Sequence, residues 1–196
     1  MNPIIVGISG GSGAILAKIA VESLLSKDIH VIVTASSSAR QMWLHELGIP
    51  FSETLSDWEE RPNFTYHNVA DIGAPIASGG QATSGMLIIP SSMATVAAIA
   101  HGFSDNLLRR AADVTIKERR PLIVLARESP LSAIHLENLL ILARLGVVIL
   151  PPAPAFYLKP ETVQDVNEYI VEKALDVLGV PNAMPDKFRY GGREEP

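Results

Sequence analysis

The stretch that decides the fold is residues 4–25, IIVGISGGSGAILAKIAVESLL. Ile4–Ile8 is a short apolar run without polar alternation, which predicts a strand buried on both faces. Glycine and serine dominate the next residues, and Ala14–Leu25 then has the apolar spacing of a helix. A buried strand joined to a helix by a glycine-rich loop is typical of doubly wound α/β domains. In such domains ligands bind at the carboxyl ends of the strands.

The glycine-rich loop departs from the best-known nucleotide-binding motifs. A dinucleotide fingerprint would need a glycine where Leu16 stands, and a Walker A loop would need a lysine where Ala14 stands. Gly7–Gly11 matches the G-x-S-x-G pattern of a nucleophile elbow, but nothing in the sequence places an acid and His135 beside Ser9. Two interpretations stay open: a cradle of backbone N–H groups for a phosphate, or glycines that only allow close helix packing.

Apolar runs and helical patterns alternate along the rest of the chain. Residues 48–83 are polar and contain three prolines, and we predict an irregular segment there with a short helix around Ser56–Glu60. The other predicted strands are Val31–Thr34, Met86–Ile89, Leu122–Ala126 and Val147–Leu150, and the other helices are Ser37–Leu47, Met93–Ala100, Asn106–Arg119, Ser132–Leu145 and Thr162–Leu178.

This alternation predicts one doubly wound α/β domain over residues 1–179, Rossmann-like or flavodoxin-like, with a mostly parallel sheet and helices on both faces. Residues 180–196 are rich in proline, glycine and charge. We expect them to form a C-terminal arm that packs on a neighbouring subunit.

The composition of the chain argues against some classes of partner and of binding site. A net charge of −5 on 196 residues argues against nucleic acid or an anionic membrane as partner. The chain has no cysteine, and its five histidines show no paired ligand spacing, so we expect no metal site. No leader or membrane span is evident, which favours the cytoplasm. The hydrophobic fraction of 47% is high and favours a homo-oligomer.

Hydroxyl groups follow three of the predicted strands. Ser9 and Ser12 lie in the first loop, Ser36–Ser38 follows the second strand, and Ser91–Thr95 opens a helix after the strand at 86–89. Because these strand ends share one edge of the sheet, they would form an uncharged crevice rich in donors. Such a crevice suits a mononucleotide with a planar ring, such as a flavin, better than a triphosphate.

At this point GISGGSGA (7–14), PSSMAT (90–95), the central stretch 106–142 and PPAPAFYLKPETVQD (151–165) together resemble the UbiX family of flavin prenyltransferases. The resemblance implies that dimethylallyl monophosphate alkylates reduced FMN at N5 and then C6. The product, prenylated FMN, serves a UbiD-type decarboxylase. It also implies a metal-independent enzyme and a dodecamer with active sites between subunits. Two alternatives stay open: an FMN-dependent decarboxylase of the same superfamily, and a non-enzymatic carrier of FMN or prenylated FMN.

The resemblance also assigns site residues. It implies catalytic roles for Ser12, Glu46, Arg110, Lys117 and Glu128. It also implies that Tyr157 and Lys173 bind the prenyl phosphate. Some members of the family have arginine at position 173, and Phe188 is our candidate for a tryptophan found near the C-terminus of many members. The residues implied for FMN are Gly10, Gly11, Ser12, Ser36, Ser92, Met93, Ala94, Thr95 and Arg127.

Several of these residues have plainer interpretations when the residues alone are considered. On the helix at 106–119 and just beyond it, Arg109, Arg119 and Arg120 are predicted to be solvated, whereas Arg110 and Lys117 share a face because they lie seven residues apart. The remaining plain interpretations are a surface acid for Glu46, a strand-end ion pair for Arg127 and Glu128, a core aromatic for Tyr157 and a solvated amine for Lys173.

Overall fold

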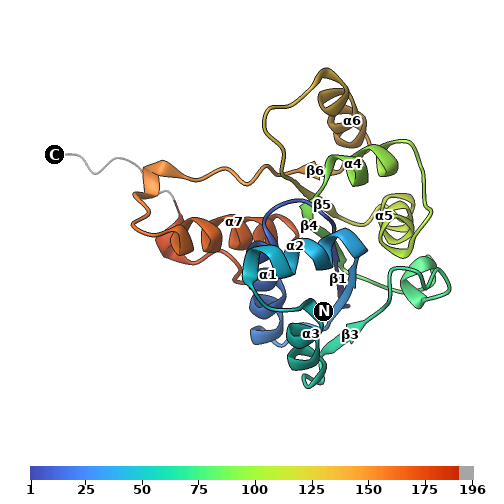
Figure 1. Ribbon diagram of the computed structural model, residues 1–196, viewed down its shortest axis with the longest axis horizontal. Coiled ribbons are helices and arrows are strands. Elements are labelled where there is room, and N and C mark those ends of the chain that lie inside the picture. Colours follow the sequence, from blue (N-terminus) through green and yellow to red (C-terminus); the bar gives the residue numbers. More distant parts are fainter. Residues whose placement is uncertain (190–196) are drawn as a thin grey trace.

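A computed structural model describes residues 1–189 and shows a parallel sheet of six strands in the order β3-β2-β1-β4-β5-β6 (Figure 1). Every pairing in this sheet is parallel, and the direction of winding reverses between β1 and β4. The strands are β1 (Ile4–Ile8), β2 (Val31–Ala35), β3 (Phe64–Tyr66), β4 (Gly85–Ser91), β5 (Leu122–Ala126) and β6 (Val148–Ile149).

Helices cover both faces of the sheet and create two cores. Because successive strand residues point to opposite faces, Ile4 packs with helices α1 and α7, whereas Ile5 packs with α4 and α5. The predicted doubly wound α/β fold is therefore confirmed. The helices are α1 (Ala14–Ser26), α2 (Ser37–Leu47), α3 (Phe51–Glu59), α4 (Met93–Ala100), α5 (Leu107–Lys117), α6 (Ala133–Arg144) and α7 (Val163–Val177), with 3-10 turns η1 (Pro75–Ala77), η2 (Phe156–Leu158) and η3 (Asp186–Phe188).

The prediction of an irregular segment over residues 48–83 was wrong in part. The expected short helix is the longer α3, and β3 adds a strand beside β2. An aromatic cluster explains why they form: the ring of Trp43 lies edge-on to Phe51 and Trp58, at centroid distances of 5.1 and 5.7 Å. These contacts join residues distant in sequence, so local patterns did not reveal them.

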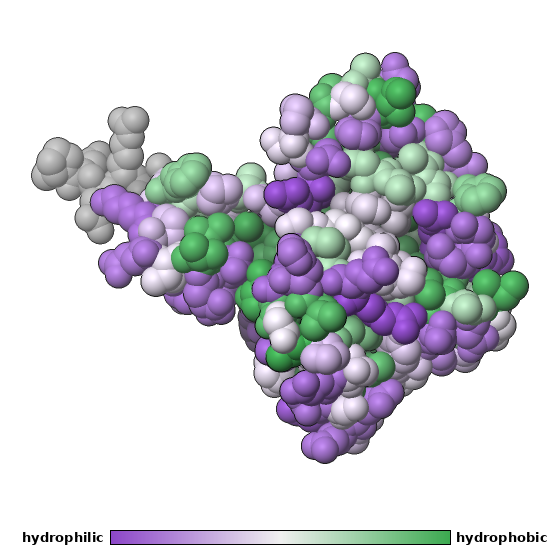
Figure 2. Space-filling view, viewed as in Figure 1, coloured by the Kyte–Doolittle hydropathy of each residue, from purple (hydrophilic) through white to green (hydrophobic). Residues whose placement is uncertain are grey.

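The last part of the described chain projects from the body of the molecule, at the left of Figure 2. It contains η2, η3 and the start of α7, whose later residues 170–175 pack into the core beside α1 (Figure 1). Val180, Ala183 and Phe188 are buried against the same chain. Packing of residues 180–196 on a neighbouring subunit stays a prediction, and residues 190–196 of that arm lie outside the described residues. Within residues 1–189 no helix has both the length and the apolar character needed to cross a membrane.

Candidate functional site

Three loops meet at the carboxyl ends of β1, β2 and β4. The buried Ser9 hydroxyl donates to the carbonyl of Pro90 at 3.1 Å and accepts from the N–H of Ser92 at 2.7 Å. The loop also lies against the segment that follows β2, because a Cβ atom on Gly10 would come within 2.5 Å of the Ser38 hydroxyl. Glycine at position 10 is therefore required by this close approach.

Serine hydroxyls cap two of the helices that start at this edge. Ser36 accepts from the N–H of Ala39 at 3.1 Å at the start of α2, and Ser92 accepts from the N–H of Thr95 at 3.3 Å at the start of α4. The remaining N–H groups of these first turns, with the partial positive charge of the helix ends, favour an anion. Both caps were among the residues predicted for FMN.

Helix α1 is capped differently, by a carboxylate from another helix. Its N-cap residue Gly13 has φ 118° and no capping side chain. Instead Glu46, near the end of α2, accepts from the N–H groups of Gly13 and Ala14 at 3.0 and 2.7 Å. In the described structure a carboxylate therefore occupies these two N–H groups, and the prediction of a phosphate cradle extends only to the other N–H groups of the loop. Glu46 is also more than a surface acid.

The surroundings of Glu46 keep it ionised. Partial burial raises the pKa of Glu46. Hydrogen bonds from the Ser12 hydroxyl and from the N–H groups of Ala14 and Gly13 lower it, as does the nearby charge of Arg127. These effects together outweigh burial, so the pKa lies below its ordinary value. The structure thus brings together Ser12, Glu46 and Arg127, three of the predicted site residues, around one carboxylate.

Arg127 and Glu128 directly follow β5 at the same edge. The backbone N–H of Arg127 donates to the carbonyl of Ser91 at 3.2 Å, which fixes the loop after β5 to the loop after β4. Both side chains are exposed, and the Glu128 carboxylate accepts from the N–H of Ser129 at 3.0 Å. Arg127 therefore adds a cation to the serine-capped helix ends, a donor set that fits the phosphate of a mononucleotide.

The remaining residues predicted for FMN lie in the same loops. Gly11 lies against the backbone of Ser91, where a Cβ atom would come within 3.2 Å. In the first turn of α4, Met93 and Thr95 are buried and Ala94 is exposed.

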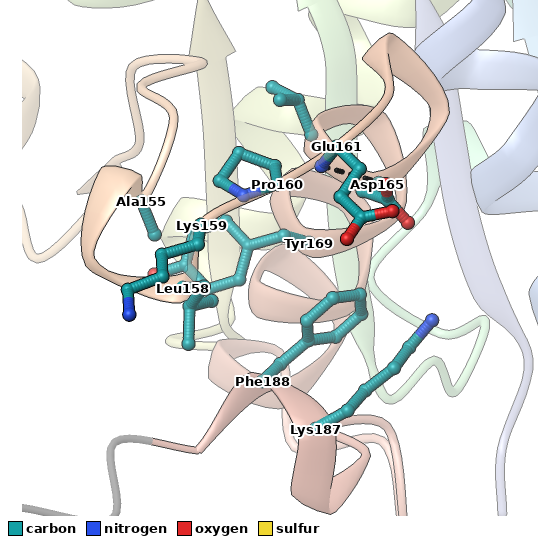
Figure 3. Close-up of a pocket in the computed structure, with 10 residues that line it drawn as sticks. Ala155, Leu158, Lys159, Pro160, Glu161, Asp165, Tyr169, Lys187 and Phe188 are labelled. Carbon is teal, nitrogen blue, oxygen red and sulfur yellow. Dashed lines mark hydrogen bonds between the residues drawn. The ribbon is translucent and has the colours of Figure 1, made fainter.

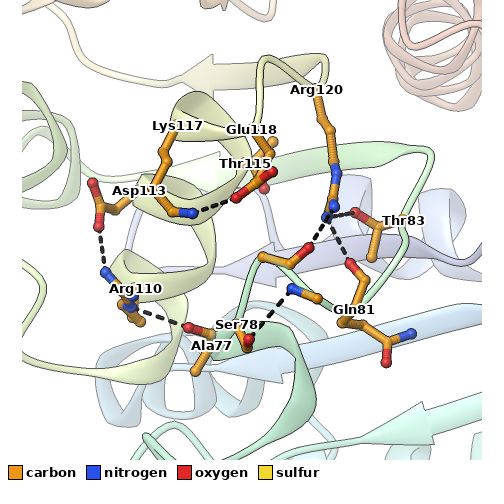
Figure 4. Close-up of polar contacts among 12 residues, drawn as sticks. Ala77, Ser78, Gln81, Thr83, Arg110, Asp113, Thr115, Lys117, Glu118 and Arg120 are labelled. Carbon is orange, nitrogen blue, oxygen red and sulfur yellow. Dashed lines mark hydrogen bonds and ion pairs between the residues drawn. The ribbon is translucent and has the colours of Figure 1, made fainter.

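Arg110 and Lys117 lie elsewhere, on α5, and their side chains reach the segment 77–83 (Figure 4). Arg110 donates from Nε to the carbonyl of Ala77 at 3.1 Å and pairs with Asp113 at 2.7 Å. Lys117 pairs with Glu118, and its Nζ atom lies 3.0 Å from where a Cβ atom on Gly79 would stand. Both cations therefore lie against residues 77–79 and share one face of α5, and it is the shared face that their spacing of seven predicted.

Arg120 corrects another expectation. We predicted a solvated side chain, but its guanidinium donates to the carbonyls of Gln81 and Gly79 at 2.6 and 2.8 Å, and to the hydroxyl of Thr83 at 3.3 Å. It holds the segment before β4 in place. Arg119 is exposed as predicted, and Arg109 pairs with Asp105 at 2.7 Å.

Tyr157 and Lys173 line a pocket of about 460 Å³ on the outer side of α7. The hydroxyl of Tyr157 lies 3.4 Å from that of Tyr169, and Arg189 lines the same pocket. Tyr157 is 57% exposed, so its plain interpretation as a core aromatic was wrong. Tyr169 was missed, although it precedes Lys173 by one helical turn.

Phe188 closes one wall of this pocket. Its ring lies edge-on to Tyr169 at 5.7 Å between centroids, so η3 is fixed on α7. The same two rings line a smaller neighbouring pocket of about 270 Å³, which also contains Lys159 and Lys187 (Figure 3). The aromatic residue in the C-terminal segment thus shapes the pocket that holds Tyr157 and Lys173.

The structure does not bring all predicted cations together in one chain. Helix α5, with Arg110 and Lys117, packs on the core of one sheet face, and α7, with Lys173, packs on the core of the other. Within one chain the two sets of cations therefore belong to helices on opposite faces of the sheet.

Comparison with known proteins identifies the family. The profile described as Flavoprotein matches residues 1–175. The chain is 47% identical over 178 residues to a flavin prenyltransferase UbiX of Chlamydia muridarum (91% of this chain and 93% of that one), and 42% identical over 203 residues to the UbiX of Synechocystis (98% of each).

Solved structures agree with the sequence comparison. AnUbiX, crystallised with FMN and dimethylallyl pyrophosphate, superposes with a TM-score of 0.90 at 36% identity, covering 98% of this chain and 99% of that one. A dodecameric FMN-dependent UbiX-like decarboxylase of Escherichia coli gives 0.85 at 40% identity, covering 90% and 94%. The resemblance stated from the sequence is confirmed: the chain belongs to the flavoprotein family and, within it, to the UbiX flavin prenyltransferases.

Proposed function

We propose that this protein is a flavin prenyltransferase that transfers the dimethylallyl group of dimethylallyl monophosphate to N5 and C6 of reduced FMN. The observation that carries the proposal is the crevice at the carboxyl ends of β1, β2 and β4, where serine-capped helix ends, Arg127 and the ionised Glu46 converge. Relatives with this name match nearly the whole chain.

The residues of the crevice divide between binding and proton transfer. Ser36, the Ser92–Thr95 turn and Arg127 would hold the FMN phosphate, with Gly10 and Gly11 giving the room for a close approach. When bound and reduced, FMN supplies the ring atoms N5 and C6 that accept the prenyl group. Ser12 and Glu46 form a hydroxyl–carboxylate pair at the same loop, in which the ionised carboxylate accepts from the Ser12 hydroxyl and would hold it in position for catalysis. Glu128, at the end of β5, is the candidate acid or base.

The prenyl phosphate needs positive charge as its C–O bond breaks, because negative charge grows on the leaving group. Arg110, Lys117, Lys173 and the Tyr157 hydroxyl are the candidate groups. They lie on opposite faces of the sheet in one chain, so we infer that a site combines Lys117 of one subunit with Lys173 of another. A homododecamer, the state named for the E. coli relative, would supply such contacts.

A mass measurement tests the function. Reduced protein–FMN is incubated anaerobically with dimethylallyl monophosphate and excess EDTA, and the released flavin is weighed by mass spectrometry. A gain of one prenyl unit is expected, and EDTA should not change the yield. An unchanged flavin mass would favour the carrier, and loss of activity in EDTA would point to a bound metal. Dimethylallyl pyrophosphate, present in the AnUbiX complex, is run in parallel.

The decarboxylase alternative has its own measurement. Two of the solved relatives, at 40% and 36% identity, carry decarboxylase names, so release of CO₂ from aromatic acids is assayed with the purified FMN-loaded protein alone. We expect none without a UbiD-type partner, which would receive the prenylated FMN. Delivery to that partner, and action in the cytoplasm, belong to this proposal.

A further inference from the structure

The pocket beside Tyr157 contains more donors than the family resemblance assigned. Besides Tyr157 and Lys173, its walls include the Tyr169 hydroxyl and the Arg189 guanidinium, and its apolar side is made by Met184 and Phe188. Two cations and two phenols beside an apolar wall match the two ends of a small prenyl phosphate.

Both cations are weakly held in the described structure. Lys173 Nζ lies 3.6 Å from the carboxylate of Asp176, and Arg189 Nε lies 3.5 Å from that of Asp186. The Arg189 side chain is 61% exposed and Lys173 is 43% exposed. Exposed ion pairs of this length contribute little to stability, so either cation can turn to a phosphate at small cost.

Tyr169 stays a hydrogen-bond donor throughout the physiological pH range. Its contact with Tyr157, together with burial, raises its pKa to about 12. The Tyr169 ring also packs edge-on against Phe188. The hydroxyl therefore lies at a defined position beside Tyr157. Because it is protonated, it can donate a hydrogen bond to an anion there.

We propose that Arg189 and Tyr169 bind the phosphate of the prenyl donor together with Lys173 and Tyr157. Arg189 can form the bidentate hydrogen bonds that Lys173 cannot, because a guanidinium offers parallel N–H groups to two phosphate oxygens. The proposal rests on the proposed function for the identity of the donor, but the phosphate pocket itself does not.

Binding is measured first, without turnover. The full chain loaded with oxidised FMN is titrated by calorimetry with dimethylallyl monophosphate, and separately with inorganic phosphate. Arg189→Ala and Tyr169→Phe should each weaken both interactions, about tenfold for the arginine and about threefold for the phenol. Arg61→Ala and Tyr66→Phe, at the β3 edge of the sheet, are matched controls and should bind as the unaltered protein does.

Kinetics and a double variant sharpen the test. In the anaerobic prenylation assay, Arg189→Ala should raise KM and also lower kcat, because phosphate binding is lost and the leaving phosphate has one cation fewer beside it. In a protein that also carries Lys173→Arg, the increase in KM caused by Arg189→Ala should be less than half as large. The arginine at position 173 then offers the two parallel N–H groups to the phosphate. An undiminished increase in that protein would overturn the compensating role of Arg189.

The possible results distinguish an error in the assigned phosphate pocket from an error in the proposed prenyltransferase function. If the unaltered protein prenylates FMN and both variants bind phosphate normally, the pocket assignment is wrong and the function stands. If no prenylated flavin forms but both variants lose phosphate binding, the pocket stands and the donor is a different small organic phosphate.

Discussion

Glu46 shows how one side chain can join the start of one helix to another helix at the carboxyl edge of the sheet. Its carboxylate replaces the usual capping residue of α1, which Gly13 lacks, and it does so from α2. The residue is ionised because three hydrogen bonds and Arg127 outweigh the effect of burial on its pKa. A single carboxylate therefore joins α2 to the first loop and to Arg127 at the carboxyl edge of the sheet.

Glu46→Gln should lower the melting temperature by about 1–4 °C at pH 7, because the helix end loses its anion. The folded-state pKa is depressed, so this stabilisation is present above the ordinary value of 4.5 and is lost as pH falls through the lower folded-state value. The difference from the unaltered protein should therefore shrink below pH 4.5. Calorimetric melts at pH 7 and 4 measure it, with exposed Glu60→Gln as control; a constant difference would contradict the mechanism.

Gly10→Ala tests the close approach of two loops. An added methyl group would lie 2.5 Å from the Ser38 hydroxyl, so the loops after β1 and β2 must separate. We expect FMN affinity to fall at least tenfold, as measured by fluorescence titration, whereas Gly80→Ala, whose nearest neighbour would be 3.7 Å away, should bind normally. Equal affinities for both variants would show that the flavin does not depend on this contact.

At the scale of elements, local patterns predicted the alternation of strands and helices but not everything that long-range contacts determine. Strands β1, β2, β4 and β5 are continuous apolar runs, so their burial was evident. Strand β3 has three half-buried residues and exists because it pairs with β2. The contact of Glu46 with α1 spans more than thirty residues, and only the resemblance drew attention to it.

The segment 77–83 is held as an element by Arg120. Removing the guanidinium in Arg120→Ala leaves two carbonyls and a hydroxyl without their donor, at a cost of about 1–3 kcal/mol in the free energy of unfolding. Hydrogen exchange should accelerate in residues 77–83 and not in β1. Arg119→Asn is the matched control, because Arg119 is exposed and its φ of 55° suits asparagine. Unchanged exchange in this segment would contradict the assignment.

At the scale of the whole molecule, one chain keeps apart the groups that we propose for the reaction. The crevice with Glu46 is at the carboxyl edge of the sheet, Lys117 is on the face covered by α5, and Lys173 is on the face covered by α7. Sequence spacing predicted that Arg110 and Lys117 share a helix face, but it carried no information on which sheet face each helix would cover. We therefore expect these residues to serve one reaction where copies of the chain meet.

Mixed assemblies test this arrangement directly. Lys117→Ala and Lys173→Ala should each lose about 10²–10³-fold in prenylation rate, because each removes a cation from the leaving phosphate. When equal amounts of the two variants are dissociated and reassembled together, a site that draws Lys117 and Lys173 from different subunits has both lysines in roughly a quarter of cases, by random pairing of subunits. Activity should therefore recover to about a quarter of that of the unaltered protein. If both lysines of a site came from one subunit, every site would lack one of them and mixing would restore nothing.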